Sequence, residues 1–258
     1  MCDLRKYFSN GFIAINNRSL SNLLLISFLF LSFGSFSQDN DTTGLQPMDM
    51  QSWNVGRFTY KFNPKWSIAV QAEARISDNI SRLDEAIFKL YSHVNFSDKV
   101  GLSFGFKYID RPDSYNDFDP WQEVVFPRKY GLFLASHQIR LEERIIQTVP
   151  GVLPRIRYLL NFSHPIGNSI AYYTGFGAVR FNIGEKGVGP VAGFEQFRIY
   201  IGIGFHLGGV TRLEIGYLYR YEVSRDAQNL NDSVIHLNLF FNNKKREVKQ
   251  PLPNDHFQ

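Results

Sequence analysis

The stretch Phe194–His206 (FEQFRIYIGIGFH) contains the pattern that decides the fold. Large apolar residues alternate in it with residues that are charged, polar or small. One face carries Phe197, Ile199, Ile201, Ile203 and Phe205, and the other carries Gln196, Arg198, Tyr200, Gly202 and Gly204. A repeat of two residues places successive side chains on opposite sides of an extended chain. The stretch therefore predicts a β-strand with one apolar and one polar face.

The same alternation recurs along most of the chain, and no segment shows a helical period. Large apolar residues face one way, and small or charged residues face the other. We expect eleven strands, over residues 53–62, 66–76, 86–96, 100–109, 121–130, 132–144, 155–163, 169–182, 194–206, 211–222 and 232–242. Most are near the ~10 residues that a tilted strand needs to cross a membrane.

The connections between these strands alternate between short turns and long polar loops. Short turns at one end and long loops at the other are typical of outer-membrane barrels. If the last strand ends in the periplasm, the first of eleven strands starts at the outer face, so one more crossing is needed. Residues 38–51 could supply a short extra strand or pass through the lumen as a polar leader.

The polar faces of the strands decide between a membrane barrel and a soluble β-sandwich. These faces combine glycines with isolated Arg, Glu, Gln and His, which suits a crowded polar interior. Aromatic residues concentrate toward strand ends, as in Tyr60–Phe62, Tyr217–Tyr221 and Phe240–Phe241, and such residues form interfacial girdles. We predict an all-β, closed antiparallel up-and-down transmembrane β-barrel of about 10–12 strands over residues 52–242. A secreted sandwich or lipocalin-like domain is the alternative.

The N-terminus predicts export. Leu20–Phe36 is nearly free of charge and follows Arg5, Lys6 and Arg18, as in a signal peptide. We predict a cleavable signal peptide over residues 1–37, and an uncleaved membrane anchor is the alternative. Cys2, the only cysteine, would be removed with it, which excludes disulfides and thiolate metal sites from the mature chain. Residues 243–258 are expected to form a polar periplasmic tail.

Composition and charge limit the classes of partner. The chain has 258 residues, of which 44% are hydrophobic, yet its mean hydropathy is −0.21, so apolar residues are interleaved with polar ones. The formal net charge is +4, and the arginines are dispersed, so a nucleic-acid partner is not expected.

Several segments together resemble the DUF2490 family of bacterial outer-membrane proteins. They are Trp53–Phe62, Arg140–Arg144 (RLEER), Arg155–Tyr158 (RIRY), Phe194–Arg198 and Glu214–Tyr217. The resemblance covers nearly all of the mature chain and implies an outer-membrane barrel, without an activity assigned to any residue. The chain departs from the family pattern at Ile170–Phe181, where Gly175 or a neighbour replaces an expected acidic residue.

Charged residues on the polar faces predict a network inside the barrel. An unpaired charge there would cost several kcal/mol, so ion pairs and hydrogen bonds are expected. The predicted lumen network comprises Glu73, Arg75, Arg140, Glu142, Arg144, Arg155, Arg157, Gln196, Arg198, Arg212, Glu214 and Arg220. A solute-binding or pore-lining role for these residues is the alternative.

Catalytic and metal sites are not expected. Ser136, His137 and Glu143 offer a nucleophile, a base and an acid, but adjacent residues of a strand face opposite sides. The histidines, His93, His137, His164, His206 and His236, show no spacing typical of metal ligands, and no cofactor motif occurs.

The sequence thus predicts an outer-membrane β-barrel of structural or transport type, in the manner of a porin, and not an enzyme. Its expected partners are outer-membrane lipids, lipopolysaccharide and the barrel-assembly machinery. One alternative is an outer-membrane enzyme that modifies lipid or lipopolysaccharide. Another is a secreted binding module.

Overall fold

The computed structural model describes residues 48–112, 114–225 and 228–243, and within them the chain is all β. The predicted signal peptide and nearly all of the predicted tail lie outside these residues. No helix in the described ranges is long and apolar enough to cross a membrane. The strands are β1 (Asp49–Lys61), β2 (Trp66–Ser77), β3 (Arg82–Ser97), β4 (Val100–Asp110), β5 (Asp117–Tyr130), β6 (Phe133–Ile146), β7 (Leu153–Pro165), β8 (Ala171–Asn182), β9 (Gly193–His206), β10 (Thr211–Glu222) and β11 (Leu230–Asn242).

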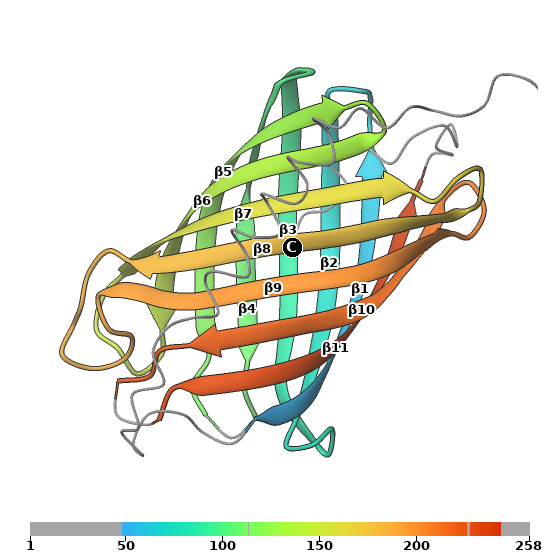
Figure 1. Ribbon diagram of the computed structural model, residues 1–258. Helices are drawn as coiled ribbons and strands as arrows, with labels where there is room; N and C mark the ends of the chain where they lie inside the picture. The colour runs from blue at the N-terminus through green and yellow to red at the C-terminus, as the bar shows by residue number, and fades with distance from the viewer. Residues whose placement is uncertain (1–47, 113, 226–227, 244–258) are drawn as a thin grey trace, which may run out of the picture. The chain divides into compact units, whose positions relative to one another are not determined.

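The eleven strands form one closed barrel (Figure 1). Each strand pairs antiparallel with its neighbours in the chain, and β1 closes the barrel by pairing with β11. That last pair is parallel, from Asp49↔Asp232 to Thr59↔Asn242. The prediction of a wholly antiparallel barrel is therefore wrong at the closure. In an up-and-down sheet with an odd number of strands, the first and last strands run in the same direction, so closure has to be parallel.

The expected extra crossing before the first strand is not present among the described residues. Asp49–Gln51, which we assigned to a leader, is instead the first part of β1. The rest of the predicted leader, residues 38–47, lies outside the described residues. The parallel seam therefore closes the barrel with eleven strands, and β1 starts at the end opposite to the one where β11 ends.

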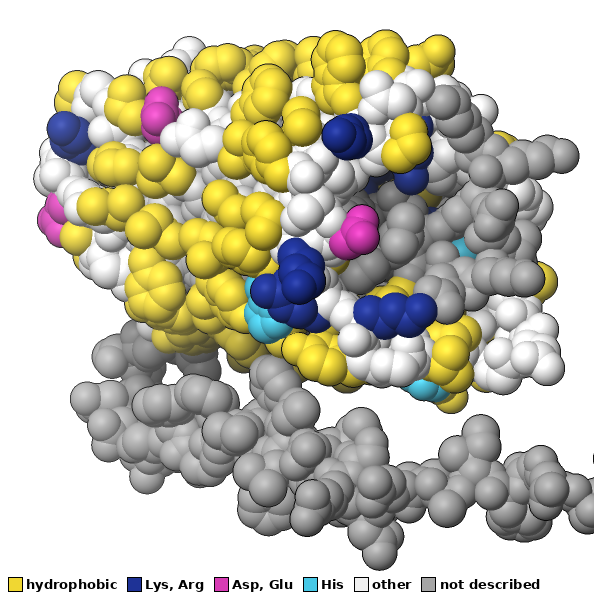
Figure 2. Space-filling model, turned by 90° about the horizontal axis from the view of Figure 1, so that it is seen from above, with side chains coloured by type: hydrophobic (Ala, Val, Ile, Leu, Met, Phe, Trp, Pro, Cys, Tyr) yellow, Lys and Arg dark blue, Asp and Glu magenta, His cyan; other side chains and the backbone are white. Residues whose placement is uncertain are grey.

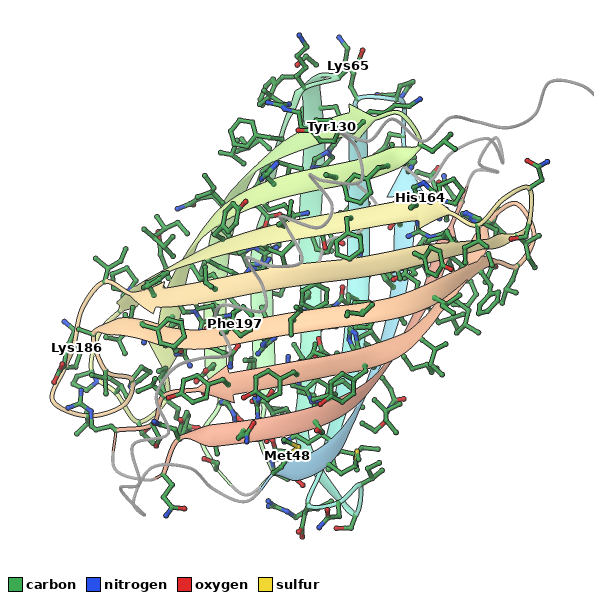
Figure 3. The ribbon with its side chains drawn as sticks, viewed as in Figure 1. Met48, Lys65, Tyr130, His164, Lys186 and Phe197 are labelled. Atoms are coloured by element: carbon green, nitrogen blue, oxygen red, sulfur yellow. The ribbon has the colours of Figure 1, made fainter. Side chains whose placement is uncertain are left out.

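The barrel has a short-turn end and a long-loop end. Lys65, Tyr130 and His164 lie at the short-turn end, whereas Met48 and Lys186 lie at the other (Figure 3). β1 begins at the long-loop end, and β11 ends at the short-turn end, where the Asn243 N–H donates to the Thr59 carbonyl oxygen at 3.2 Å. The alternation of connection lengths predicted from the sequence is present except between β2 and β3, where only residues 78–81 join the strands.

The outer wall of the barrel is apolar. Large hydrophobic side chains from every strand are exposed on it, among them Val70, Phe104, Ile139, Ile201 and Ile235. Figure 2 shows a broad area of hydrophobic side chains on the face in view. Phe240 was predicted to belong to an aromatic girdle at the membrane boundary, and this is wrong. It is buried inside the barrel between the guanidinium groups of Arg57 and Arg212.

β5 begins four residues earlier than predicted, at Asp117 instead of residue 121. The stretch Asp117–Pro120 is polar and ends in proline, which made it resemble a loop. In the barrel Asp117 and Asp119 point into the lumen. Pro120 pairs with β4, and the register with β6 skips from Phe118 to Trp121. A proline has no N–H to donate, so it is tolerated where the ladder is interrupted.

Candidate functional site: the charged lumen

The structure buries all twelve residues of the predicted lumen network, with exposed fractions between 1% and 8%. They form two groups. The first group lies on β2, β6 and β7 and belongs to a continuous ion-pair network, which also includes residues outside the predicted set. The members of this first group are Glu73, Arg75, Arg140, Glu142, Arg144, Arg155 and Arg157. The second group lies on β9 and β10 and contains Gln196, Arg198, Arg212, Glu214 and Arg220.

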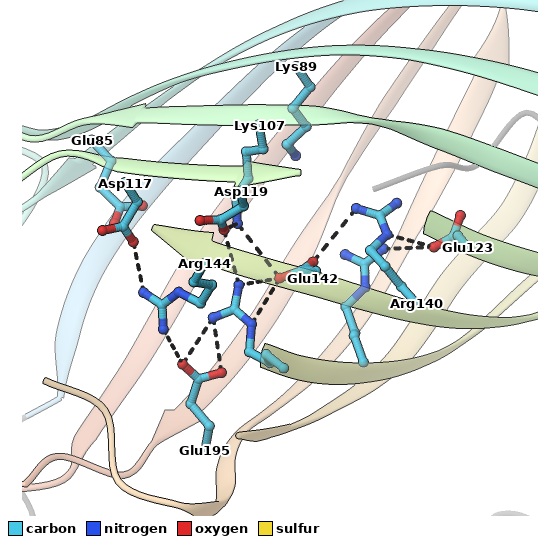
Figure 4. Close-up of polar contacts among 12 residues, drawn as sticks. Glu85, Lys89, Lys107, Asp117, Asp119, Glu123, Arg140, Glu142, Arg144 and Glu195 are labelled. Carbon is cyan, nitrogen blue, oxygen red and sulfur yellow. Dashed lines mark hydrogen bonds and ion pairs between the residues drawn. The ribbon is translucent and has the colours of Figure 1, made fainter. Parts of the chain in front are cut away.

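Glu142 and Arg155 form the centre of the ion-pair network. They lie directly opposite each other on β6 and β7, so their side chains meet across the strands. Arg155 Nε donates to Glu142 Oε2 at 2.8 Å, and its Nη2 contacts the same oxygen. Lys107 Nζ lies 3.9 Å from Glu142 Oε2 and 2.6 Å from Asp119 Oδ2 (Figure 4). The central carboxylate is thus shared by cations from two other strands.

The network continues toward the long-loop end through Glu195. Arg155 Nη1 and Arg144 Nη1 both lie 3.0 Å from Glu195 Oε1. Arg144 Nη2 also donates to Asp117 Oδ2 at 2.7 Å. Each arginine therefore bridges two carboxylates, as a planar guanidinium with five N–H groups allows.

From Asp117 on β5 the network continues along the wall to β3 and β2. Arg111 Nη1 lies 3.5 Å from Asp117 Oδ2, and its Nη2 lies 2.8 Å from Glu85 Oε1. Glu85 also accepts from Arg75 Nη1 at 2.6 Å. Arg75 Nε donates to Glu73 Oε1 at 2.7 Å. The ion pairs therefore link strands β2 to β7 and β9 inside the barrel.

Toward the short-turn end, the network ends at Glu123 of β5. Arg140 Nε donates to Glu123 Oε2 at 2.9 Å, and Arg157 Nη2 donates to the same oxygen at 3.2 Å. The guanidinium carbon of Arg140 also lies 3.6 Å from the ring centroid of Trp121, a cation–π contact.

Glu195 enters the lumen because β9 contains an irregularity that the sequence pattern hides. Strict alternation would place Glu195 on the outer face, opposite to Gln196. The register between β8 and β9 shifts at this point, because Arg180 pairs with Gln196 whereas Phe181 pairs with Phe194. The extra residue, Glu195, is unpaired, and both Glu195 and Gln196 are buried. A β-bulge re-aims a side chain in this manner.

Other network members were missed for simpler reasons. Lys89 and Lys107 lie on strands whose alternation was recognised, and both occupy the inner face. The periodicity could therefore have identified them. Asp117 and Asp119 lie in a polar segment whose composition predicts a loop. Glu85 precedes the predicted start of its strand, residue 86, and it lies beside a register shift between β2 and β3.

The second half of the lumen is filled mainly by aromatic and aliphatic side chains. This aromatic cluster comprises Trp53, Leu159, Phe176, Ala178, Tyr200, Leu218 and Val234. The sequence pattern predicts small or charged residues inside, so these large rings correct that prediction. Trp53 connects the two halves, because the guanidinium carbons of Arg75 and Arg198 lie 3.8 and 4.8 Å from its ring centroid.

The remaining predicted residues have partners near this cluster. Glu214 accepts a hydrogen bond from the Tyr172 hydroxyl at 2.6 Å. Arg220 Nε donates to Asp232 Oδ2 at 2.5 Å. Arg212 lies over the ring of Phe240, with its guanidinium carbon 4.7 Å from the centroid.

A cavity of about 90 Å³ remains between the two halves. It is large enough for a few water molecules or a small ion. Its lining includes Arg or Lys at eleven positions and Glu at five, so its walls carry an excess of positive charge. Trp53 and Phe176 supply part of its apolar surface. The lumen is therefore nearly filled.

The structure does not bring the considered catalytic residues together. Ser136 is fully buried in the lumen, whereas Glu143 is exposed on the outer face. His137 also points outward, where its Nδ1 lies 2.7 Å from the Tyr158 hydroxyl oxygen. Within the described ranges, no group of three His, Cys, Asp or Glu residues could hold a metal ion.

Comparison with known proteins gives a family but no activity. The family model described as "Protein of unknown function (DUF2490)" matches residues 50–231, which include all the motif segments that suggested the resemblance. An uncharacterized protein of Methylorubrum extorquens, MexAM1_META1p0181, is 27% identical over 182 residues, covering 66% of this chain and 78% of that protein. No solved structure matches.

Proposed function

The chain belongs to the DUF2490 family of unknown function, and we propose that it is an outer-membrane β-barrel with a lumen closed by its own side chains. In this proposal an exported chain inserts with the help of the barrel-assembly machinery, and its wall contacts outer-membrane lipids and lipopolysaccharide. The role is structural or of a transport type restricted to small solutes. The observation that carries the proposal is the distribution of polarity between the two faces of the wall.

A soluble barrel or sandwich has the opposite distribution. Its outward face is hydrophilic, and its apolar face points to the core. Here large apolar residues such as Ile139 and Ile201 are 50% and 62% exposed on the wall, while the charges are buried inside. In water such a surface would promote association, whereas in hydrocarbon it is favourable. Closure of the sheet also supports this proposal, since it leaves no unpaired strand edge for lipid.

Aromatic residues near the short turns also support a membrane location. Tyr60, Phe62, Trp66, Phe96 and Tyr130 are all exposed at that end, with Phe62 and Trp66 stacked at 4.6 Å between ring centroids. Aromatic rings prefer the boundary between hydrocarbon and headgroups. We assign this ring of residues to the periplasmic boundary and the long loops to the outer face.

Membrane fractionation tests the location directly. We expect the full-length protein to sediment with outer-membrane vesicles, to resist extraction with urea, and to migrate differently on gels with and without boiling. Recovery as a soluble periplasmic or secreted protein would overturn the proposal.

Conductance tests the state of the lumen. Because the ion-pair network and the aromatic cluster leave a cavity of only about 90 Å³, we expect no stable open-pore conductance in planar bilayers. A steady conductance of the size given by general porins would contradict a filled lumen.

A further inference from the structure

A row of arginine side chains crosses the inner wall of five neighbouring strands. Arg140 of β6 lies opposite Arg157 of β7, and Arg157 lies opposite Arg180 of β8. Arg198 of β9 lies opposite Arg220 of β10. Arg180 pairs with the residue two positions before Arg198, so these two are diagonal neighbours. Directly opposed like charges are destabilising, so the row needs negative charge between its members.

Carboxylates supply that charge only at the two ends of the row. Glu123 accepts from Arg140 and Arg157, and Asp232 accepts from Arg220. The middle of the row differs. Among the residues that the structure describes, no carboxylate oxygen lies within 4.0 Å of the side-chain nitrogens of Arg180 or Arg198. Two cations on adjacent strands therefore have no direct counter-charge.

Three buried Nε–H groups in this region have no acceptor among the described residues. The Nε atoms of Arg157, Arg180 and Arg198 are buried, and within the described part of the chain none of them has a hydrogen-bond partner. Only 8% of Arg198 is exposed. A buried donor without a partner is costly, and more so when it is charged. All three arginines line the cavity described above.

We propose that this cavity is a binding site for a small oxoanion of the phosphate or sulfate class, held between Arg180 and Arg198. Such an anion presents several acceptor oxygens, and guanidinium groups bind it through paired, charge-assisted hydrogen bonds. Its charge would offset the repulsion within the arginine row. The site goes beyond the proposed membrane role and does not depend on it.

The geometry also indicates how an anion reaches the site. Arg111 and Glu222 line the cavity near the long-loop end, and they keep 18% and 29% of their side chains exposed. The cavity is thus closest to solvent at that end.

Thermal unfolding of the full-length protein in a zwitterionic detergent tests the proposal. A ligand that binds only the folded state raises the unfolding temperature with its concentration. We expect inorganic phosphate to raise it more than sodium chloride does at equal ionic strength. Equilibrium dialysis with labelled phosphate then measures the affinity directly. Equal effects of the two salts, with no retained phosphate, would overturn the proposal.

Variants locate the site. Each of Arg180→Gln and Arg198→Gln removes one charged donor and is expected to weaken phosphate binding about tenfold or more. Arg225→Gln, which alters a loop arginine paired with Glu185, is the matched control and retains the full response. Phosphate binding that persists unchanged in both lumen variants would contradict this site.

The unliganded state gives a second readout that does not require binding. Because Arg180 lies beside other arginines without a direct counter-charge, Arg180→Gln is expected to leave the phosphate-free protein at least as stable as the parent. A large loss of stability in phosphate-free buffer would show that Arg180 already has a compensating partner, and the proposal would fail. Location of the protein outside the outer membrane would overturn the proposed function but not this one.

Discussion

The two halves of the lumen are filled by different chemistry. On one side, strands β2 to β7 and residue Glu195 hold the ion-pair network, in which each carboxylate is shared by two or more cations. On the other side, β1 and β7 to β11 contribute the aromatic cluster around Tyr200 and Phe176. The ionic half needs every partner, because a buried charge without one is costly. The stability of the aromatic half depends mainly on the volume that its side chains fill, and less on which apolar residues fill it.

This comparison predicts that an isosteric change is most damaging in the ionic half. Glu142→Gln keeps the shape of the side chain but removes the negative charge shared by Arg155 and Lys107. We expect a loss of about 3–5 kcal/mol in the free energy of unfolding, because buried cations remain without compensation. Denaturant titration in detergent micelles measures it.

A neighbouring residue gives the matched control for this change. Glu143 is adjacent in sequence but exposed on the outer face. Glu143→Gln should therefore leave the free energy of unfolding close to that of the parent protein. Equal losses in the two variants would show that position on β6, and not the lumen network, determines the effect.

The aromatic half is sensitive to added volume where rings approach the backbone. A Cβ on Gly216 would lie 2.6 Å from the Gly202 Cα and 2.7 Å from the Tyr200 ring, and it would also contact the Ile201 carbonyl oxygen. We expect Gly216→Ala to cost about 1–3 kcal/mol in unfolding free energy, the usual cost of overpacking. Gly177→Ala is the control, since a Cβ there meets nothing within 4 Å. A neutral Gly216→Ala would refute the tight packing beneath Tyr200.

A change of shape without added volume should be tolerated better in the same half. Phe176 stacks on Tyr200 with 5.2 Å between ring centroids. Phe176→Leu keeps an apolar side chain of similar size, and we expect a cost of less than about 1.5 kcal/mol. The same denaturant titration gives the comparison with Glu142→Gln. If Phe176→Leu cost as much, the contrast between the two halves would be lost.

The same contrast determines how much could be predicted from sequence. Strict alternation places Arg140, Glu142 and Arg144 on one face, and the structure buries all three in the lumen. Periodicity reports only which side a residue faces. It predicted the existence of all eleven strands because each has a separate two-residue pattern.

Features that depend on register between strands could not be predicted. The bulge that turns Glu195 inward depends on the pairing of β8 with β9, and Asp117 and Asp119 were hidden in a polar segment next to a proline. The parallel seam follows from the strand number and not from a residue pattern. Phe240 lies inside because its inner-face position, between Arg57 and Arg212, outweighs the usual preference of a strand-end aromatic for the membrane boundary.

The smallest effect is expected for an ion pair outside both halves. Glu185 of the β8–β9 loop pairs with Arg225 of the β10–β11 loop, whose Nη2 lies 2.9 Å from Glu185 Oε1. The hydrogen bond from Arg225 holds the pKa of Glu185 below its ordinary value. Since Glu185 is exposed, water screens the pair, and Glu185→Gln should not change the unfolding midpoint measurably. A lowered folded-state pKa means that any contribution exists at neutral pH and is lost on acidification through that pKa. Carboxyl NMR titration checks this, because the pKa of Glu185 should rise toward the ordinary value in Arg225→Gln. An unchanged pKa would show that the backbone N–H of Ala192, which also donates to Glu185, is the main cause.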